Sequence, residues 1–123
     1  MHEFNNQKPL YIQLKELIEK LILDDVLKPE EMIPSIRILA KDYQLNPLTV
    51  SNAIDDLVND GILYKKRGIG MFVKSNAKER IKEQQLENFK SCELMATIQK
   101  AKSLGMVAKE IDEMIKRIFG GNL

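Results

Sequence analysis

The sequence predicts a mostly α-helical fold with one small β-hairpin, and three patterns support this prediction. Apolar residues recur every three or four positions between residues 9 and 59, the spacing of helices that bury one face. Two short β-like runs follow, joined by the glycine-containing turn at residues 67–70. From residue 77 the helical spacing returns among many lysines and glutamates. We therefore expect an N-terminal domain over residues 1–76 and a two-helix extension over residues 77–123.

Length and composition are those of an ordinary globular protein, with 123 residues, 44% hydrophobic and 30% charged. No stretch approaches the roughly 20 apolar residues that cross a bilayer, and the N-terminus lacks the apolar segment of a secretion signal. We therefore expect a cytoplasmic protein without membrane contact. Cys92 is the only cysteine and His2 the only histidine, which excludes an internal disulfide and a cysteine-based zinc site. We expect neither an enzyme nor a bound metal or cofactor.

The first helix is expected over residues 9–24. Pro9 suits the first turn of a helix, and Lys28-Pro29 lies beyond its end because proline disfavours helical backbone in the residue before it. One apolar face runs along this helix and consists of Leu10, Leu14, Leu17, Ile18, Leu21 and Ile22. The helix should support the segment that follows.

Two shorter helices are expected next, the first beginning at Ser35 and the second spanning about residues 47–59. Ser35 can cap the first of them, and Asn46 followed by Pro47 has the pattern of a cap and a first helical residue. The second helix has one apolar stripe, formed by Val50, Ala53, Ile54 and Leu57. Gly61 stands where a left-handed residue would end this helix.

A β-hairpin is expected from residues 62–66 and 71–74, with the turn Arg67-Gly68-Ile69-Gly70 between them. A Gly-x-Gly pattern also occurs in phosphate-binding loops, but those loops lead directly into a helix, and here a second strand follows. Helix, turn, helix and hairpin in this order predict a winged helix-turn-helix. The basic residues Lys65, Lys66 and Arg67 stand at the wing tip, although such a triplet also occurs in solvated loops.

The C-terminal part predicts a long charged helix over about residues 77–103, a break at Leu104-Gly105, and a last helix over about residues 107–119. The apolar faces of these two helices are too large to leave in water, and a pair of helices makes too thin a layer to bury them. A second copy of the chain would cover them, while the alternative is that they fold back on their own domain. The candidate dimerisation residues are Ile81, Leu86, Phe89, Met95, Ile98, Ile111, Met114, Ile115 and Ile118.

Four motifs in register resemble the GntR family of bacterial transcription regulators, specifically its short YtrA-like branch. They are P-L-Y-x-Q at Pro9–Gln13, P-S-x-R at Pro34–Arg37, L-N-P-x-T-V at Leu45–Val50, and the wing that ends at Val73. The resemblance implies a winged-helix DNA reader followed by two helices that form a homodimer. It also implies repression from operators near the regulated genes.

The resemblance and the helix-turn-helix pattern together assign the DNA-binding residues. In such motifs the start of the second helix enters the major groove, and Arg37 would project from the helix before it. The wing would contact the minor groove or the phosphate backbone. The candidate residues are Ser35, Arg37, Asn46, Pro47, Leu48, Thr49, Ser51, Asn52, Lys65, Lys66, Arg67 and Gly68. The acidic residues later on this helix, Asp55, Asp56 and Asp60, are expected to point away from the duplex or to brace neighbouring loops.

The sequence thus predicts a sequence-specific DNA-binding regulator, a homodimeric repressor on a palindromic operator. Two alternatives stay open: Arg37 could form a surface ion pair, and the winged helix could be a protein-interaction module, which a net charge of only +1 favours. Asp25 and Glu30 stand where relatives usually have glycine, and Asn52 stands where they often have a basic residue. No set of residues identifies a small-molecule effector site.

Overall fold

The computed structural model describes residues 3–121, so His2 lies outside it. The chain forms two compact units, Met1–Glu83 and Gln84–Leu123. The predicted boundary after residue 76 falls inside the first unit, because Ala77 and Ile81 at the start of the following helix are buried in its core. No helix in the described part of the chain is long and apolar enough to span a membrane.

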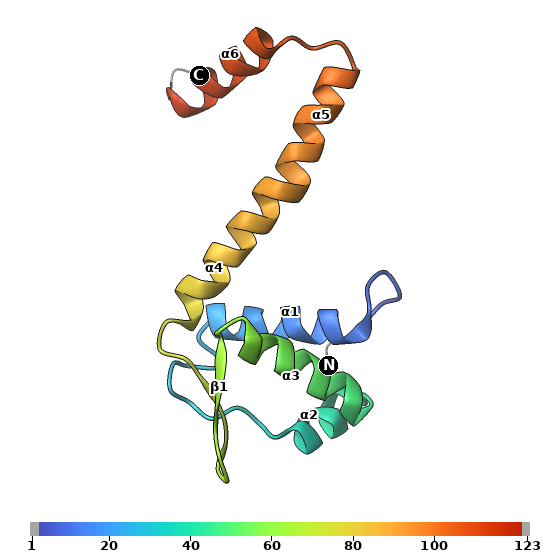
Figure 1. The fold of residues 1–123 in the computed structure, drawn as a ribbon, viewed down its shortest axis with the longest axis vertical. Coiled ribbons are helices and arrows are strands. Elements are labelled where there is room, and N and C mark those ends of the chain that lie inside the picture. The colour runs from blue at the N-terminus through green and yellow to red at the C-terminus, as the bar shows by residue number, and fades with distance from the viewer. Residues whose placement is uncertain (1–2, 122–123) are drawn as a thin grey trace. The chain divides into compact units, whose positions relative to one another are not determined.

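The first unit contains helices α1 (Leu10–Leu23), α2 (Ile36–Tyr43) and α3 (Pro47–Asn59), followed by strands β1 (Leu63–Lys66) and β2 (Gly70–Val73) and the start of α4 (Ala77–Asn88) (Figure 1). The strands pair antiparallel, with Leu63 opposite Val73 and Lys66 opposite Gly70. This confirms the predicted fold of several helices and one hairpin. One apolar core joins the elements, and its fully buried large members include Leu14, Ile18, Ile22, Val50, Leu57, Ile62, Leu63, Val73 and Ile81.

Polar caps set the ends of the two short helices. The Ser35 hydroxyl accepts a hydrogen bond from the Ile38 backbone N–H (3.2 Å), and the Asn46 side chain accepts one from the Leu48 N–H (2.8 Å). Each cap satisfies a backbone donor that the first turn of a helix leaves free. Gln44 ends α2 with a left-handed backbone (φ 54°), and Gly61 follows α3 with φ 78°. The helix-turn-helix therefore begins and ends where its sequence predicts.

The loop before α2 acts as a third strand beside the wing. Met32 forms a β-bridge with Phe72, and the Glu30 and Ile33 amides donate to the carbonyls of Val73 (2.8 Å) and Met71 (2.9 Å). Glu30 has a positive φ of 66°, and so does Asp25 (61°) in the same loop. These are the two positions where the sequence resemblance leads us to expect glycine, which adopts this left-handed conformation without strain.

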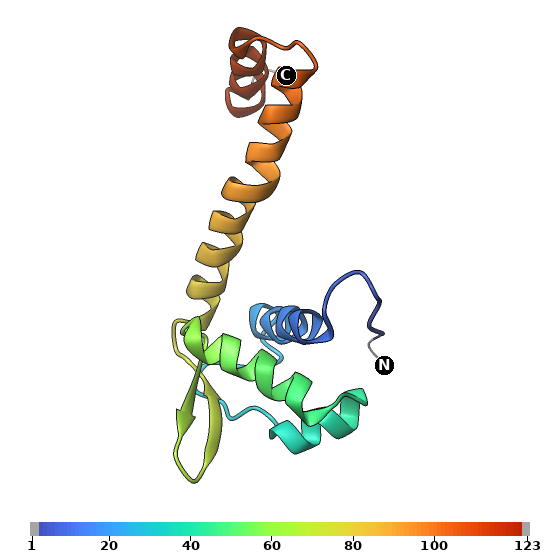
Figure 2. The same ribbon diagram turned by 45° about the vertical axis from the view of Figure 1, so that its right-hand side comes forward.

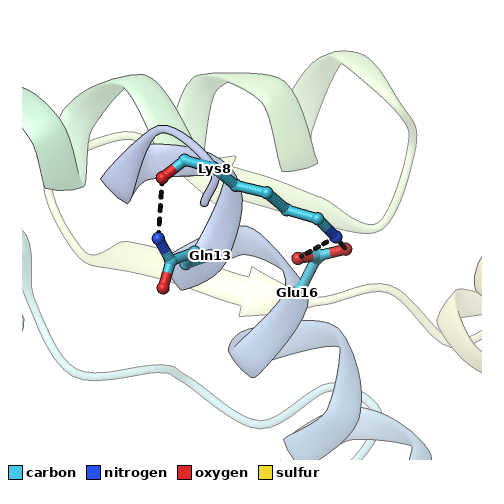
Figure 3. A network of polar contacts seen from close by, with 3 residues as sticks. All are labelled: Lys8, Gln13 and Glu16. Atoms are coloured by element: carbon cyan, nitrogen blue, oxygen red, sulfur yellow. Dashed lines mark hydrogen bonds and ion pairs between the residues drawn. The ribbon is translucent and has the colours of Figure 1, made fainter. Parts of the chain in front are cut away.

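A buried glutamine fixes the segment before α1 (Figure 3). The side chain of Gln13 donates to the carbonyls of Asn5 and Lys8, both at 2.7 Å, and accepts from the Asn5 amide at 2.9 Å. The Lys8 ammonium lies 2.9 Å from the Glu16 carboxylate. Gln13 thus has its hydrogen-bonding groups satisfied, as a buried amide requires. It belongs to the P-L-Y-x-Q motif, and its place in the structure gives that motif a structural role.

The second unit comprises the end of α4, a π-helical segment η1 (Phe89–Leu94), α5 (Met95–Ser103) and α6 (Ala108–Phe119). The chain turns sharply between α5 and α6, where Gly105 has a positive φ of 94° (Figure 2). The sequence predicts one regular helix over residues 77–103. The structure differs from this prediction, because a π-helical segment, η1, interrupts the helix. A π-helix brings residues five apart onto one face. It therefore places Leu94 on the side of Phe89, which a regular helix would not do.

Candidate nucleic-acid interface

A groove of about 520 Å³ lies between the start of α2, the middle of α3 and the wing. Four of the predicted DNA-binding residues line it: Ser35 and Arg37 from α2 and its cap, Ser51 from α3, and Lys65 from β1. These residues are far apart in the sequence, and the packing of α2 and the wing on α3 brings them together. The groove is open to solvent and carries both basic and hydroxyl groups on its wall.

The start of α3 offers mostly exposed side chains. Asn46, Pro47, Leu48 and Asn52 are exposed, and Thr49 and Ser51 are half-buried. Asn46 uses its side-chain oxygen as the helix cap, which leaves its amide N–H groups for another partner. Leu48 is 67% exposed, an apolar side chain of the kind that contacts a thymine methyl in the major groove.

Arg37 is exposed, and within residues 3–121 no ion pair involves it. The alternative of a surface ion pair therefore has no partner in the structure. The Arg37 guanidinium lines the groove and carries two parallel N–H donors. That arrangement suits the two major-groove acceptors of guanine.

The wing is stiffened by a stack of aromatic rings. Tyr64 and Phe72 face each other across the two strands with ring centroids 5.8 Å apart. The Lys66 ammonium lies 4.3 Å from the Phe72 ring centroid, within the range of a cation–π contact. The Tyr64 hydroxyl donates to the Glu30 carboxylate, and this hydrogen bond raises the pKa of Tyr64. Lys66 thus lies over the aromatic rings of the wing, and it is exposed, as are Lys65, Arg67 and Gly68.

One feature of this surface is absent from the sequence prediction, and another, the position of Asp55, differs from it. Ile69, at the tip of the wing, is 67% exposed. Its place in the turn between Gly68 and Gly70 could have shown that it cannot reach a core. Asp55 lies in the groove with Arg37 and Lys65, so it shares their surface. The other two aspartates follow the expectation: the Asp60 carboxylate binds the Lys15 ammonium (2.7 Å), and Asp56 also lies near Lys15.

The candidate dimerisation residues differ in their exposure. Ile81 is fully buried in the core of the first unit, so it cannot contact another copy of the chain, and its assignment to dimerisation is corrected here. Ile111 is half-buried. The others are between 41% and 66% exposed: Leu86, Phe89, Met95, Ile98, Met114, Ile115 and Ile118. No residue in the described part of the second unit, 84–121, is buried.

Comparisons with known proteins agree with this architecture. Residues 10–73 match the family model described as "Bacterial regulatory proteins, gntR family". The chain is 34% identical over 110 residues to the HTH-type transcriptional repressor YtrA of Bacillus subtilis (strain 168), covering 89% of this chain and 84% of that one.

Solved structures give the same result. A GntR family transcriptional regulator from Listeria monocytogenes has a TM-score of 0.63 and 30% identity, covering 93% of this chain and 98% of its own. The structure of AraR(DBD) in complex with operator ORX1 has a TM-score of 0.55 and 33% identity, covering 58% of this chain and 92% of its own. On the match of residues 10–73 and the likeness to YtrA over most of both chains, this protein belongs to the gntR family of bacterial regulatory proteins.

Proposed function

We propose that the protein is a sequence-specific DNA-binding repressor that works as a homodimer on a palindromic operator in the bacterial cytoplasm. The observation that carries this proposal is the groove, where Arg37, Ser51 and Lys65 converge from three separate elements. AraR(DBD), which is similar over 58% of this chain, has been solved in complex with an operator. The Arg37, Ser51 and Lys65 side chains can bind the base edges and phosphates of a DNA duplex.

In this proposal the start of α3 enters the major groove. Thr49, Ser51 and Asn52 meet base edges and phosphates, and Arg37 binds guanine O6 and N7 with two hydrogen bonds. The wing tip lies against the minor groove or the backbone, where Lys65 and Arg67 neutralise phosphates. Asn46 and Ser35 have a second function as caps, because they fix the helix ends that present the other side chains.

A homodimer explains the second unit. Its apolar side chains remain exposed because the unit has no core of its own, and exposed patches of this kind mark association surfaces. A two-fold dimer would present its heads to half-sites about 34 Å apart, one turn of DNA. Each chain has a net charge of only +1, so a single copy attracts DNA weakly, and joining two copies raises the effective affinity.

Selection of bound sequences from a random DNA pool at fixed salt tests the proposal. We expect enrichment of an inverted repeat with half-sites about 10 base pairs apart, and an affinity that falls steeply as salt rises. Enrichment of no sequence, together with binding that salt does not weaken, would contradict it and favour the protein-interaction module. Sedimentation at micromolar concentration tests the dimer separately, and a monomer there would overturn that part.

A further inference from the structure

Asp55 places a carboxylate on the surface that is otherwise suited to DNA. It is exposed, and it follows Ser51 by one turn of α3, so both side chains project to the same side of the helix. Both line the groove together with Arg37 and Lys65. No ion pair in residues 3–121 involves Asp55, although two cations share its groove. Its charge therefore stays available to whatever enters the groove.

The neighbouring Asp56 provides the contrast. It is half-buried on the side of α3 that faces α1, and its charge acts on Lys15. Two adjacent aspartates thus have different surroundings, one facing the protein and one facing the groove. A purely solubilising role would not require Asp55 to line the same groove as Arg37 and Lys65.

The chemistry of the duplex limits what this carboxylate can accept. An ionised carboxylate only accepts hydrogen bonds, and phosphates only repel it. In the major groove guanine presents N7 and O6 and thymine presents O4, all of them acceptors. Adenine N6 and cytosine N4 are the amino donors there. A carboxylate in contact with one strand is therefore stabilised by an adenine or cytosine and destabilised by a guanine or thymine.

We propose that Asp55 is a specificity-determining residue that selects an amino base, adenine or cytosine, over a keto base, guanine or thymine, at one position of each half-site. This inference rests on the proposed function. It also explains why an acidic residue lies in a DNA-binding groove. The negative charge of Asp55 weakens the attraction to phosphates of any sequence, and it increases the difference in affinity between an amino and a keto base at that position.

The test compares the full-length protein with its Asp55→Asn and Asp56→Asn variants in selection from a random duplex pool. Asparagine keeps the shape but both donates and accepts, so it no longer favours cytosine over guanine, although it can still pair with adenine N6 and N7. We expect Asp55→Asn to lose the preference for cytosine over guanine at one position, by roughly tenfold, and to keep the base preferences at the other positions. Its affinity for unselected DNA should rise. Asp56→Asn removes the same charge from the same helix and should match the wild type in base preference.

An Asp55→Ala protein serves as a second variant, because alanine forms no hydrogen bond with a base. It should lose the preference for amino bases at that position with an unchanged melting temperature. If both Asp55 variants keep the amino preference, or bind every sequence more tightly by the same factor, Asp55 only lowers general attraction and the inference is overturned. A wild-type protein that enriches no sequence would instead overturn the proposed function itself.

Discussion

At the scale of single residues, Arg37 carries the clearest prediction for DNA reading. Replacing it with alanine should weaken binding to the selected operator by about 1 to 3 kcal/mol and relax the sequence preference at the contacted base pair. Arg37→Lys keeps the charge but loses the paired donors, so it should keep the salt dependence while losing selectivity. Mobility-shift titrations at fixed salt measure both variants. Wild-type affinity and selectivity in Arg37→Ala would rule out a base-reading role.

Glu19 predicts a pH-dependent change in stability. Burial raises its pKa, the attraction of Lys15 partly offsets this, and Asp60 adds to the increase. Because the pKa in the folded state lies above that in the unfolded chain, the ionised carboxylate disfavours the fold. The stabilising contribution is complete below the ordinary pKa of about 4.3 and is lost as pH rises through the raised value.

Glu19→Gln should therefore raise the melting temperature at pH 7 by roughly 1–3 °C, and the advantage should disappear near pH 4. Glu83→Gln is the control, since Glu83 is exposed and pairs with Arg80. Thermal melting followed by circular dichroism over this pH range makes the comparison. A Glu19→Gln protein that is less stable at pH 7 would show that the attraction of Lys15 dominates.

The sequence predicted residues well where local chemistry decides their role. Ser35 and Asn46 were expected as caps because a small acceptor before a helix has one obvious donor to satisfy, and both bonds are present. Asp55 could not be placed in the same way. Helical periodicity shows which side of α3 Asp55 lies on. Only the packing of the wing against α3 makes that side of the helix one wall of a groove.

At the scale of elements, the π-helical segment η1 predicts that two single-residue deletions affect self-association differently. Removing Cys92 would shorten the five-residue step from Phe89 to Leu94 to four, which a regular α-helix places on one face. The apolar face and self-association should therefore survive. Removing Thr97 from the regular helix α5 would turn Met95 away from Ile98 by about 100°.

Sedimentation equilibrium distinguishes the two deletions. We expect the protein lacking Cys92 to associate as the wild type does, and the protein lacking Thr97 to associate at least roughly tenfold more weakly because its apolar face is split. Circular dichroism should show helical content close to wild type in both. If deleting Cys92 abolished association, the π-helical segment η1 itself would form part of the contact between the two copies of the chain.

The sequence predicted the ends of helices correctly where glycines and capping residues mark them. It missed the boundaries for which the spacing of apolar residues was the only signal. Gly61 and Gly105 follow the ends of α3 and α5 with positive φ. By contrast, a search for steps of three and four residues cannot find η1. Ile81 was assigned to dimerisation because α4 is continuous in sequence, and nothing in its pattern shows that its first turns are covered by the core.

At the scale of the whole molecule, we expect the first unit to fold without the second, and the second unit to raise the affinity for DNA. A protein ending at Glu83 keeps the complete core of the first unit, including Ala77 and Ile81, and should fold. It should bind one half-site with a shallower salt dependence, and it should lose the roughly 10²- to 10⁴-fold gain that linked heads provide. Mobility shifts and thermal melting of the truncated protein measure the two properties.

A full-length protein with Ile98→Glu and Met114→Glu is the matched control for the truncation. It keeps the chain length but places charges on two exposed apolar positions, 41% and 50% accessible. It should resemble the truncated protein in DNA binding and sediment as a monomer. If it binds the full operator as tightly as the wild type, association through these helices does not contribute to affinity.

The strand-like loop beside the wing has a consequence in hydrogen-exchange kinetics. The amides of Glu30 and Ile33 donate to β2, and the Val73 amide donates back to the carbonyl of Glu31 at 3.0 Å. Amides tied by one ladder exchange through a shared opening event, with similar protection. The wing and the segment that leads into α2 should therefore open together, so that the Arg37 and wing-tip contacts keep a fixed spacing before any duplex arrives.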